Sequence, residues 1–166
     1  MIRLTLVSLC MVCSTMGFPN GAPDLACKGM KPGHLPTTTS GTNPFMLNIS
    51  STTYKPGDTV TGELYGPAGS DGMFKGFLIE VGTQNSVDQE EEAVGEFVSL
   101  DSSIQKHVCG NAAITHINNK EKTRVSFSWK APQETAGTLY FRATVVQKFF
   151  PSKYWLGAFS VAITPA

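Results

Sequence analysis

The chain has none of the short motifs by which common enzyme classes are recognised. It contains no Gly-x-Ser-x-Gly elbow for a nucleophilic serine, no glycine-rich loop ending in Gly-Lys-Ser/Thr, and no His-Glu-x-x-His. Each motif places the reactive groups of one chemistry at a fixed spacing. Their absence argues against a serine hydrolase of the α/β type, a phosphate-binding loop and a zinc peptidase. We therefore expect no catalytic residues and no enzymatic activity.

An excess of charge of one sign is also lacking, because 13 lysines and arginines stand against 13 aspartates and glutamates. A nucleic-acid partner is therefore not expected, since proteins that bind nucleic acids usually carry a basic surplus. Long apolar runs are missing too. No stretch of about 20 apolar residues occurs in the chain, so no membrane span is expected.

The N-terminus has the pattern of an export signal. Arg3 gives a positive start, Leu4–Cys13 form a short apolar run, and the four residues that end at Gly17 are small or uncharged. We expect residues 1–17 to be a signal peptide cleaved after Gly17; a retained signal anchor is the alternative. The mature chain, residues 18–166, has the length of a single domain and would be secreted into the extracellular space.

Cysteines are few, and two of the four, Cys10 and Cys13, leave with the signal peptide. Their Cys-x-x-Cys spacing imitates a redox or metal motif, but it lies in the apolar run before the cleavage point. Cys27 and Cys109 remain in the mature chain. In an oxidising compartment we expect them to form a disulfide that ties the N-terminal residues to the body of the domain.

Three histidines, His34, His107 and His116, are scattered along the sequence. The disulfide would bring His34 towards the other two, and a metal site is the alternative if Cys27 and Cys109 were thiolates. Because a disulfide removes those two ligands, we expect ordinary hydrogen-bonded histidines, no metal and no cofactor.

The clearest structural pattern is the alternation in Thr123–Pro132. Val125, Phe127 and Trp129 fall on one face, while charged residues and serines fall on the other, as in a strand with one face in a core. Other strand-like segments, separated by turn signals, are residues 45–49, 59–65, 74–81, 96–100, 112–117, 138–147 and 154–163. No convincing helical period is found. The pattern predicts an all-β, immunoglobulin-like antiparallel β-sandwich of seven to eight strands; a closed barrel is the alternative.

The segments around these strands also carry information. Residues 18–43 are rich in Gly, Pro and Thr, which predicts an irregular lead-in along the domain surface. The acid-rich residues 88–96 predict a solvated loop, and residues 101–110 a connection that brings Cys109 into place. In the last strand four side chains are expected on one face: Trp155, Phe159, Val161 and Ile163.

Two surface features are candidates for function. Asn48-Ile49-Ser50 is an N-glycosylation sequon, and Asn48 falls on the outward face of the first strand. Four basic residues cluster around the outward face of residues 123–131 and the preceding turn: Lys120, Lys122, Arg124 and Lys130. Surface solvation explains this basic patch first. The functional alternative is recognition of anionic bacterial lipid or cell-wall polymers.

A series of short segments occurs in a characteristic order. They are Gly21-Ala-Pro23, Cys27, Met30-Lys-Pro-Gly-His34, Tyr54-Lys-Pro-Gly57, Phe74-Lys-Gly-Phe-Leu78, Cys109 with Thr115-His116, Ser128-Trp-Lys-Ala-Pro132 with Gly137, and Phe141-Arg-Ala-Thr-Val-Val146. Taken together they resemble the reeler domain, and in particular the small secreted insect-type defense proteins. The resemblance covers nearly the whole mature chain.

This resemblance implies an immunoglobulin-like β-sandwich, in agreement with the alternation, and it brings no catalytic motif with it. It also implies a secreted, non-enzymatic protein of innate immunity, with antimicrobial activity and with bacterial surface lipid or polysaccharide as the partner. An extracellular-matrix or adhesive interaction module is the alternative, because a β-sandwich fold does not assign a function.

Overall fold

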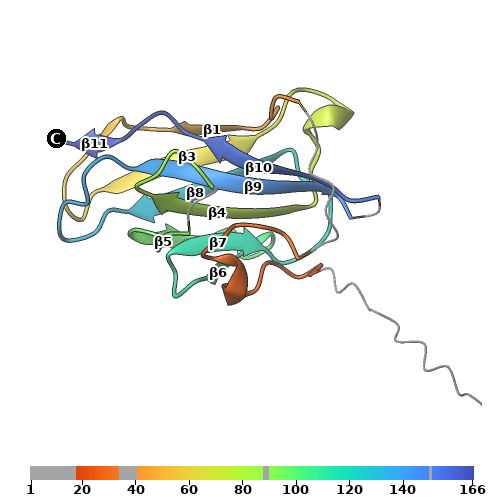
Figure 1. Cartoon of the computed structure of the whole chain (residues 1–166), viewed down its shortest axis with the longest axis horizontal. Coiled ribbons are helices and arrows are strands. Elements are labelled where there is room, and N and C mark those ends of the chain that lie inside the picture. Colours follow the sequence, from red (N-terminus) through yellow and green to blue (C-terminus); the bar gives the residue numbers. More distant parts are fainter. Residues whose placement is uncertain (1–17, 34–40, 88–89, 150) are drawn as a thin grey trace, which may run out of the picture.

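Two antiparallel sheets lie face to face and form the body of the chain (Figure 1). The computed structural model describes residues 18–33, 41–87, 90–149 and 151–166, so the expected signal peptide and His34 lie outside these ranges. One sheet has the order β1 (Met46–Ile49), β3 (Thr59–Tyr65), β8 (Arg124–Lys130), β5 (Glu96–Ser99). The other has the order β10 (Lys153–Phe159), β9 (Tyr140–Lys148), β4 (Gly76–Gly82), β7 (Ala113–His116), β6 (Gln105–Val108).

Shorter elements complete the described part of the fold. β2 (Thr53–Tyr54) and β11 (Thr164–Pro165) form a parallel pair, and two 3-10 turns are η1 (Asp24–Ala26) and η2 (Ser70–Gly72). The strands therefore exceed the seven to eight predicted, partly because β6 lies in residues 101–110, where only a connection was expected. Within the described ranges, no helix has the length and apolar character that a membrane crossing needs. The immunoglobulin-like sandwich is confirmed, and the two sheets do not close into a barrel.

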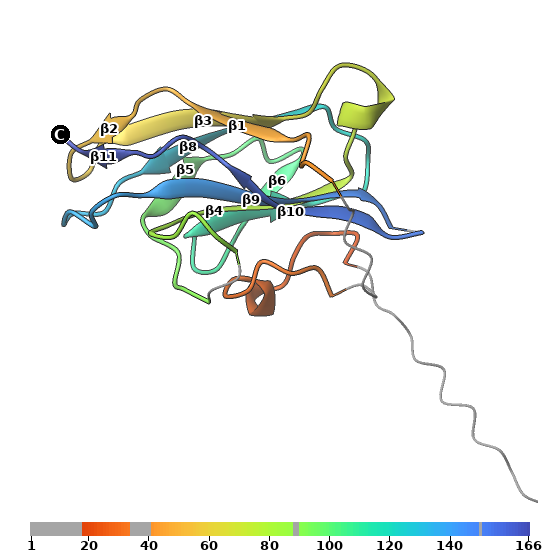
Figure 2. The same ribbon diagram turned by 45° about the horizontal axis from the view of Figure 1, so that its top comes forward.

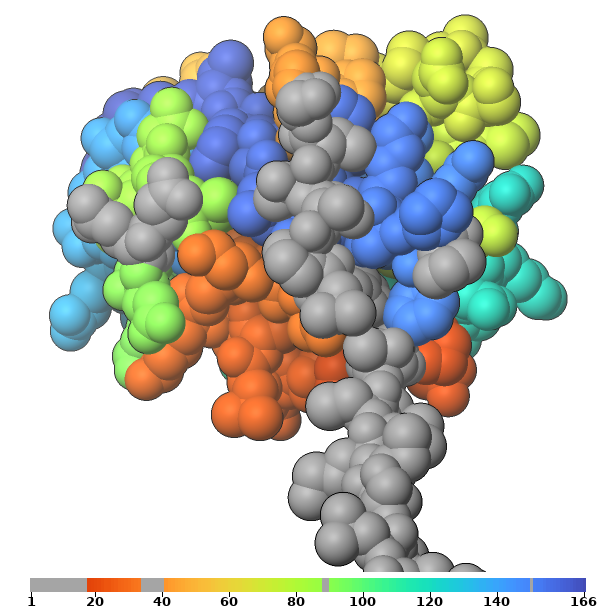
Figure 3. Space-filling view, turned by 45° about the vertical axis from the view of Figure 1, so that its right-hand side comes forward, coloured from red at the N-terminus to blue at the C-terminus, as the bar shows by residue number. Residues whose placement is uncertain are grey.

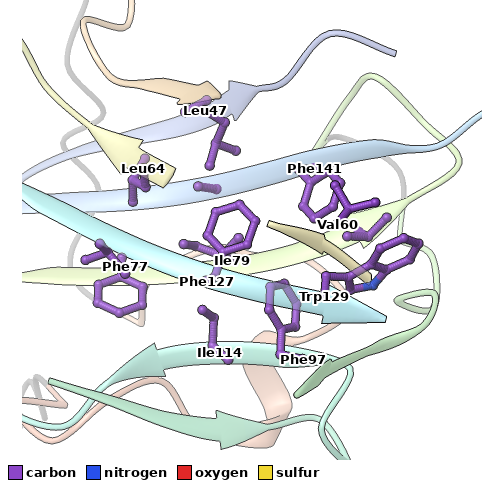
Figure 4. Packing of buried hydrophobic residues seen from close by; sticks show 14 of the residues in the cluster. Leu47, Val60, Leu64, Phe77, Ile79, Phe97, Ile114, Phe127, Trp129 and Phe141 are labelled. Carbon is purple, nitrogen blue, oxygen red and sulfur yellow. The ribbon is translucent and has the colours of Figure 1, made fainter. Parts of the chain in front are cut away.

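The core between the sheets is built from the alternation that the sequence displays. Val125, Phe127 and Trp129 of β8 are all buried, and their neighbours on the strand face outward. The ring of Phe141 in β9 stacks on Phe127 with 5.4 Å between the ring centroids and meets Trp129 edge-on at 5.3 Å. Figure 4 shows these rings between the two layers. One inward face per strand is thus enough to fill the core.

Strands β4 and β9 are buried on both faces, which the sequence pattern does not reveal. Phe77 and Ile79 point into the core between the sheets, whereas Leu78 packs on the other side, against Met30. Figure 2 shows the reason, since residues 18–33 lie below the five-stranded sheet, on the side away from the four-stranded one. This third layer gives the five-stranded sheet a second, smaller apolar core.

The alternation predicted for the last strand is wrong at its end. Trp155 pairs with Val145 but Ala158 pairs with Ala143, so β10 contains one extra residue. Gly157 takes a positive φ of 69°, which permits this bulge. The bulge changes which side chains point inward. Trp155 packs against the core between the sheets, as expected. After the bulge the inward position falls on Ala158, so Phe159, which was expected to point inward, packs on the outer side of the sheet. Val161 is 62% exposed, whereas Ile163 is buried as expected.

Candidate functional site

The residues 18–33, which we call the N-terminal segment, fold back over the outer face of the five-stranded sheet. Proline and glycine prevent a regular strand here. Gly21 has a φ of 104°, and a Cβ on it would lie 2.2 Å from the carbonyl oxygen of His116. Only glycine fits so close to β7. The glycine at position 21 therefore allows the backbone of the segment to lie directly against β7.

Long-range bonds hold this segment in place. The predicted disulfide between Cys27 and Cys109 is present, with 6.0 Å between the Cα atoms. Beside it, the carboxylate of Asp24 accepts a hydrogen bond from the Cys109 N–H at 2.8 Å. Threonine hydroxyls add two bonds: Thr115 Oγ1 accepts from the Ala22 N–H at 3.0 Å, and Thr144 Oγ1 donates to the Met30 carbonyl at 2.7 Å. The sequence predicted only the disulfide among these anchors.

A pocket of about 310 Å³ opens between the N-terminal segment and the sheet. One wall comes from the segment, including Phe18, Ala22 and Met30, and the floor comes from β4 and β9, including Leu78 and Val146. We call it the N-terminal pocket. Figure 3 shows the red and dark-orange atoms of the segment on the lower side of the domain. Most of the lining is apolar because the outward positions of β4 and β9 are apolar here.

The buried polar side chains of the N-terminal pocket, those of His116 and Thr144, already form hydrogen bonds within the chain. His116 accepts a hydrogen bond at Nδ1 from the Phe77 N–H at 3.2 Å and donates from Nε2 to the Phe18 carbonyl at 3.2 Å. Burial lowers the pKa of His116, and the positive charges of Lys122 and Lys106 add to this effect, so the neutral ring is favoured. His116 thus fixes the start of the segment instead of offering a charge to a ligand.

The two histidines within the described residues do not form a metal site. His107 Nε2 lies 2.7 Å from the Phe97 carbonyl oxygen, and His116 bonds the backbone as described. Asp24, Cys27 and Cys109 have potential ligand atoms within 4.8 Å of one another, but the two sulfur atoms are joined in the disulfide. The expectation of hydrogen-bonded histidines therefore agrees with these contacts.

The basic patch predicted from the sequence is not a continuous charged surface. Lys122 is only 6% exposed, and its ammonium donates to the carbonyl oxygens of Lys75, Asn118 and Lys120 at 2.9 to 3.0 Å. Lys122 was expected on the surface, and this is wrong because its aliphatic stem is buried and its charge is used inside the turn. Burial also lowers the pKa of Lys122.

Of the other members of the basic patch, Lys120 and Arg124 are exposed and Lys130 is half-buried, and two of the three have acidic partners. Arg124 pairs with Glu63 at 2.5 Å, and Lys130 lies 3.8 Å from Glu96. Lys120 remains at the surface of the turn. The structure thus brings Arg124 and Lys130 to one strand, as expected, but it neutralises much of their charge.

Asn48 lies on the exposed face of β1, where the sequence analysis put it. Its Nδ2 donates to the Tyr65 hydroxyl at 2.9 Å. Ser50, the third residue of the sequon, accepts a hydrogen bond from the Thr61 N–H through its hydroxyl at 3.1 Å. Asn48 therefore stands at an accessible sheet edge.

We expect the protein secreted from insect cells to carry a glycan on Asn48, because its amide is exposed on an edge strand. Intact mass before and after treatment with an N-glycosidase measures this. Asn48→Gln should lose the mass difference, and Ser50→Thr, which keeps both sequon and hydroxyl, should retain it. A wild-type mass equal to that of the bare polypeptide would contradict the prediction.

A buried charge cluster lies on the outer face of the five-stranded sheet, and the sequence analysis did not find it. The Arg142 guanidinium, 1% exposed, donates to Glu80 at 2.5 and 3.0 Å and pairs with Glu91. Burial raises the pKa of Glu80 to about 7, and the adjacent Arg142 opposes that shift. Residues 88–96 were expected to be a solvated loop, which is wrong for Glu91 because it is drawn onto Arg142. Asp88 lies outside the described residues.

Comparison with known proteins places the chain in a family. The family model described as the reeler domain matches residues 25–166. The human F-spondin reeler domain has the same fold, with a TM-score of 0.64 and 23% identity, and the match covers 78% of this chain and 94% of that one.

Relatives identified by sequence include defense proteins and ferric-chelate reductases. "Putative defense protein 3" of Antheraea mylitta is 30% identical over 90% of this chain and 88% of its own length. Ferric-chelate reductase 1 of Mus musculus is 33% identical over 91% of this chain. The chain spans only 24% of the length of that reductase. The family match, together with these relatives, shows that the chain belongs to the reeler domain family.

Proposed function

We propose that the chain is a secreted, non-enzymatic defense protein that binds amphiphilic molecules of microbial surfaces. The Antheraea mylitta relative supports the defense role, since it has a defense name and matches this chain along 88% of its length. The disulfide is consistent with an oxidising, extracellular environment. The N-terminal pocket is the observation that carries the choice of ligand.

The ligand class follows from the walls of the pocket. Its volume of about 310 Å³ falls at the lower end of small-molecule sites, which run from roughly 300 to 1,000 Å³. The side chains of Phe18, Leu78 and Val146 offer apolar surface, and burying an acyl chain against them is favourable. Thr144 and His116 already bond within the chain, so they leave little hydrogen-bonding capacity for a sugar.

A cation at the pocket favours an anionic head group. Lys31 lines the N-terminal pocket and is exposed, so its ammonium is free to meet a phosphate or carboxylate. A ligand with its acyl chain in the pocket and its acidic head group at Lys31 is an anionic amphiphile. Bacterial surface lipids have this chemistry. Because the hydroxyl of Thr144 and both ring nitrogens of His116 are hydrogen-bonded, the lining supports binding and not catalysis.

Filling the pocket tests this function. Val146 is half-buried on the pocket floor, and Val146→Trp should occupy the space while leaving the core between the sheets intact. We expect the variant to bind dodecanoate and lipopolysaccharide at least about tenfold more weakly than wild type, because the buried apolar contact is lost. Isothermal titration on the oxidised mature protein measures both ligands.

Val98→Trp is the matched control, since Val98 is 42% exposed on β5, away from the pocket. It should bind both probes as wild type does. If wild type bound neither dodecanoate nor lipopolysaccharide, or if Val146→Trp bound both with unchanged affinity, the proposed function would be abandoned.

A further inference from the structure

The tip of the N-terminal segment exposes a large aliphatic side chain in a fixed position. Leu25, in η1, is 94% exposed. The turn that carries it is closed by hydrogen bonds from the Ala26 N–H to the Pro23 carbonyl at 2.9 Å and from the Cys27 N–H to the Asp24 carbonyl at 3.1 Å. The disulfide at Cys27 follows at once. The backbone at Leu25 is therefore anchored to the domain while its side chain remains in solvent.

A single exposed leucine is common on proteins, but Leu25 has apolar neighbours. It lines the N-terminal pocket together with Phe18, which is 42% exposed, and with Pro23 and Pro32. We call these four residues the apolar rim. Because all four residues belong to the lining of the pocket, the exposed apolar surface continues into the buried apolar lining. A ligand that moves from an apolar phase into the N-terminal pocket would thus contact apolar surface first on the rim and then in the pocket.

The charges around the apolar rim favour an anionic partner surface. The N-terminal segment holds two lysines, Lys28 and Lys31, both exposed, and one aspartate. That aspartate, Asp24, accepts a hydrogen bond from the Cys109 N–H, and the two lysines of the segment outnumber it. The stem of Lys106 also runs beside the segment, since its Cε lies 2.7 Å from the position that a Cβ on Gly21 would take.

The acidic groups Asp24, Glu91 and Glu92 near this surface line a small neighbouring cavity and not the N-terminal pocket. Lys28 lines the same cavity, and Glu91 is paired with Arg142. Lys31 belongs to the pocket lining, which contains no acidic side chain among the described residues. The cationic character is therefore strongest next to the apolar rim.

We propose that the apolar rim docks on anionic membrane surfaces, with Leu25 inserted at the lipid interface and Lys31 among the head groups. Apolar side chains at the interface and lysines that meet anionic lipids are the two attractions that hold peripheral proteins on such surfaces. The inference rests on the proposed function, because docking in this orientation turns the mouth of the N-terminal pocket towards the acyl chains that it would receive.

Vesicle binding tests the docking. The oxidised mature protein is sedimented with vesicles of phosphatidylglycerol and phosphatidylethanolamine, and with phosphatidylcholine vesicles for comparison. Wild type should partition onto the anionic vesicles and less onto the neutral ones. Leu25→Asp should lower the partition coefficient at least about tenfold, since it removes a buried leucine and adds a repelled charge. Val161→Asp is the matched control, because Val161 is also an exposed aliphatic residue, at 62%, but lies near β11.

Lysine substitutions provide a second arm. Lys31→Gln should weaken partition about fivefold, in line with roughly 1 kcal/mol for each lysine near an anionic surface. Lys55→Gln, at an exposed lysine beside β2, should leave partition unchanged.

Dodecanoate titration below its micellar concentration separates the two proposals. Vesicle binding that Leu25→Asp leaves unchanged would overturn the docking, as would dodecanoate binding without any vesicle binding. A Leu25→Asp variant whose molar mass by light scattering falls from dimer to monomer would assign the rim to a second copy of the chain and overturn it too.

Discussion

The Cys27→Ala/Cys109→Ala double variant is expected to lose about 4 kcal/mol of its free energy of unfolding and to bind dodecanoate more weakly. The disulfide spans 82 residues of sequence, so its removal frees a long loop in the unfolded chain. In the native state it also releases η1, whose position depends on Cys27. Urea unfolding followed by tryptophan fluorescence gives the first quantity, and titration with dodecanoate gives the second.

Hydrogen exchange separates the two consequences of this change. The amides of β3 and β8 lie in the sheet that the N-terminal segment does not cover, and under native conditions they should stay protected in the double variant. The Ala22 amide, which bonds Thr115, should exchange faster than in wild type. Equal protection of Ala22 in both proteins, together with unchanged dodecanoate affinity, would mean that the hydrogen bonds alone hold the pocket wall.

Arg142→Met is the second change with a large expected effect, a loss of roughly 3 to 5 kcal/mol in the free energy of unfolding. Methionine keeps much of the volume, but it leaves the buried carboxylate of Glu80 without its partner and frees Glu91 from the sheet. Glu80 Oε2 already has no hydrogen-bond partner in the described part of the chain, so the remaining carboxylate would be poorly compensated. Chemical denaturation at pH 8, where Glu80 is ionised to a greater extent, measures the loss.

Arg124→Met is the matched control for this experiment. Arg124 also pairs with a glutamate, Glu63, but its side chain is 61% exposed. Solvent screens this pair, and we expect a loss below about 1 kcal/mol. Similar losses for the two variants would show that burial does not set the energy of the Arg142 cluster and would contradict the prediction.

The sequence predicts a strand of this fold well when one face of the strand is exposed to solvent. In β8, Arg124 and Ser126 face solvent while Val125 and Phe127 face the core, so a period of two reveals the strand directly. In β9, by contrast, neither face is exposed to solvent over most of the length of the strand. Arg142 and Thr144 stand at the outward positions, where polarity suggests exposure, yet both are buried beneath chain that is distant in sequence.

Other misses have local causes. β6 contains Gln105-Lys-His-Val108, in which only the two end residues are buried, and one of these is polar, so no alternation marks the strand. The bulge at Gly157 shifts the inward position from Phe159 to Ala158, and a single glycine in the sequence does not reveal whether a strand forms a bulge there. The N-terminal pocket was not predicted, because its position depends on the path of an irregular segment. Its single sequence signal was the pairing of Cys27 with Cys109.

The two sides of the N-terminal pocket depend on different parts of the chain. Its floor comes from β4 and β9, whose other faces fill the sandwich core, so substitutions there are constrained by folding. Its wall comes from residues 18–33, which add nothing to that core and are tied down at a few points. The wall can therefore change in length and composition while the scaffold stays the same. Under the proposed function, we expect exchange of this one segment between reeler domains to transfer ligand preference, much as loops do on an antibody framework.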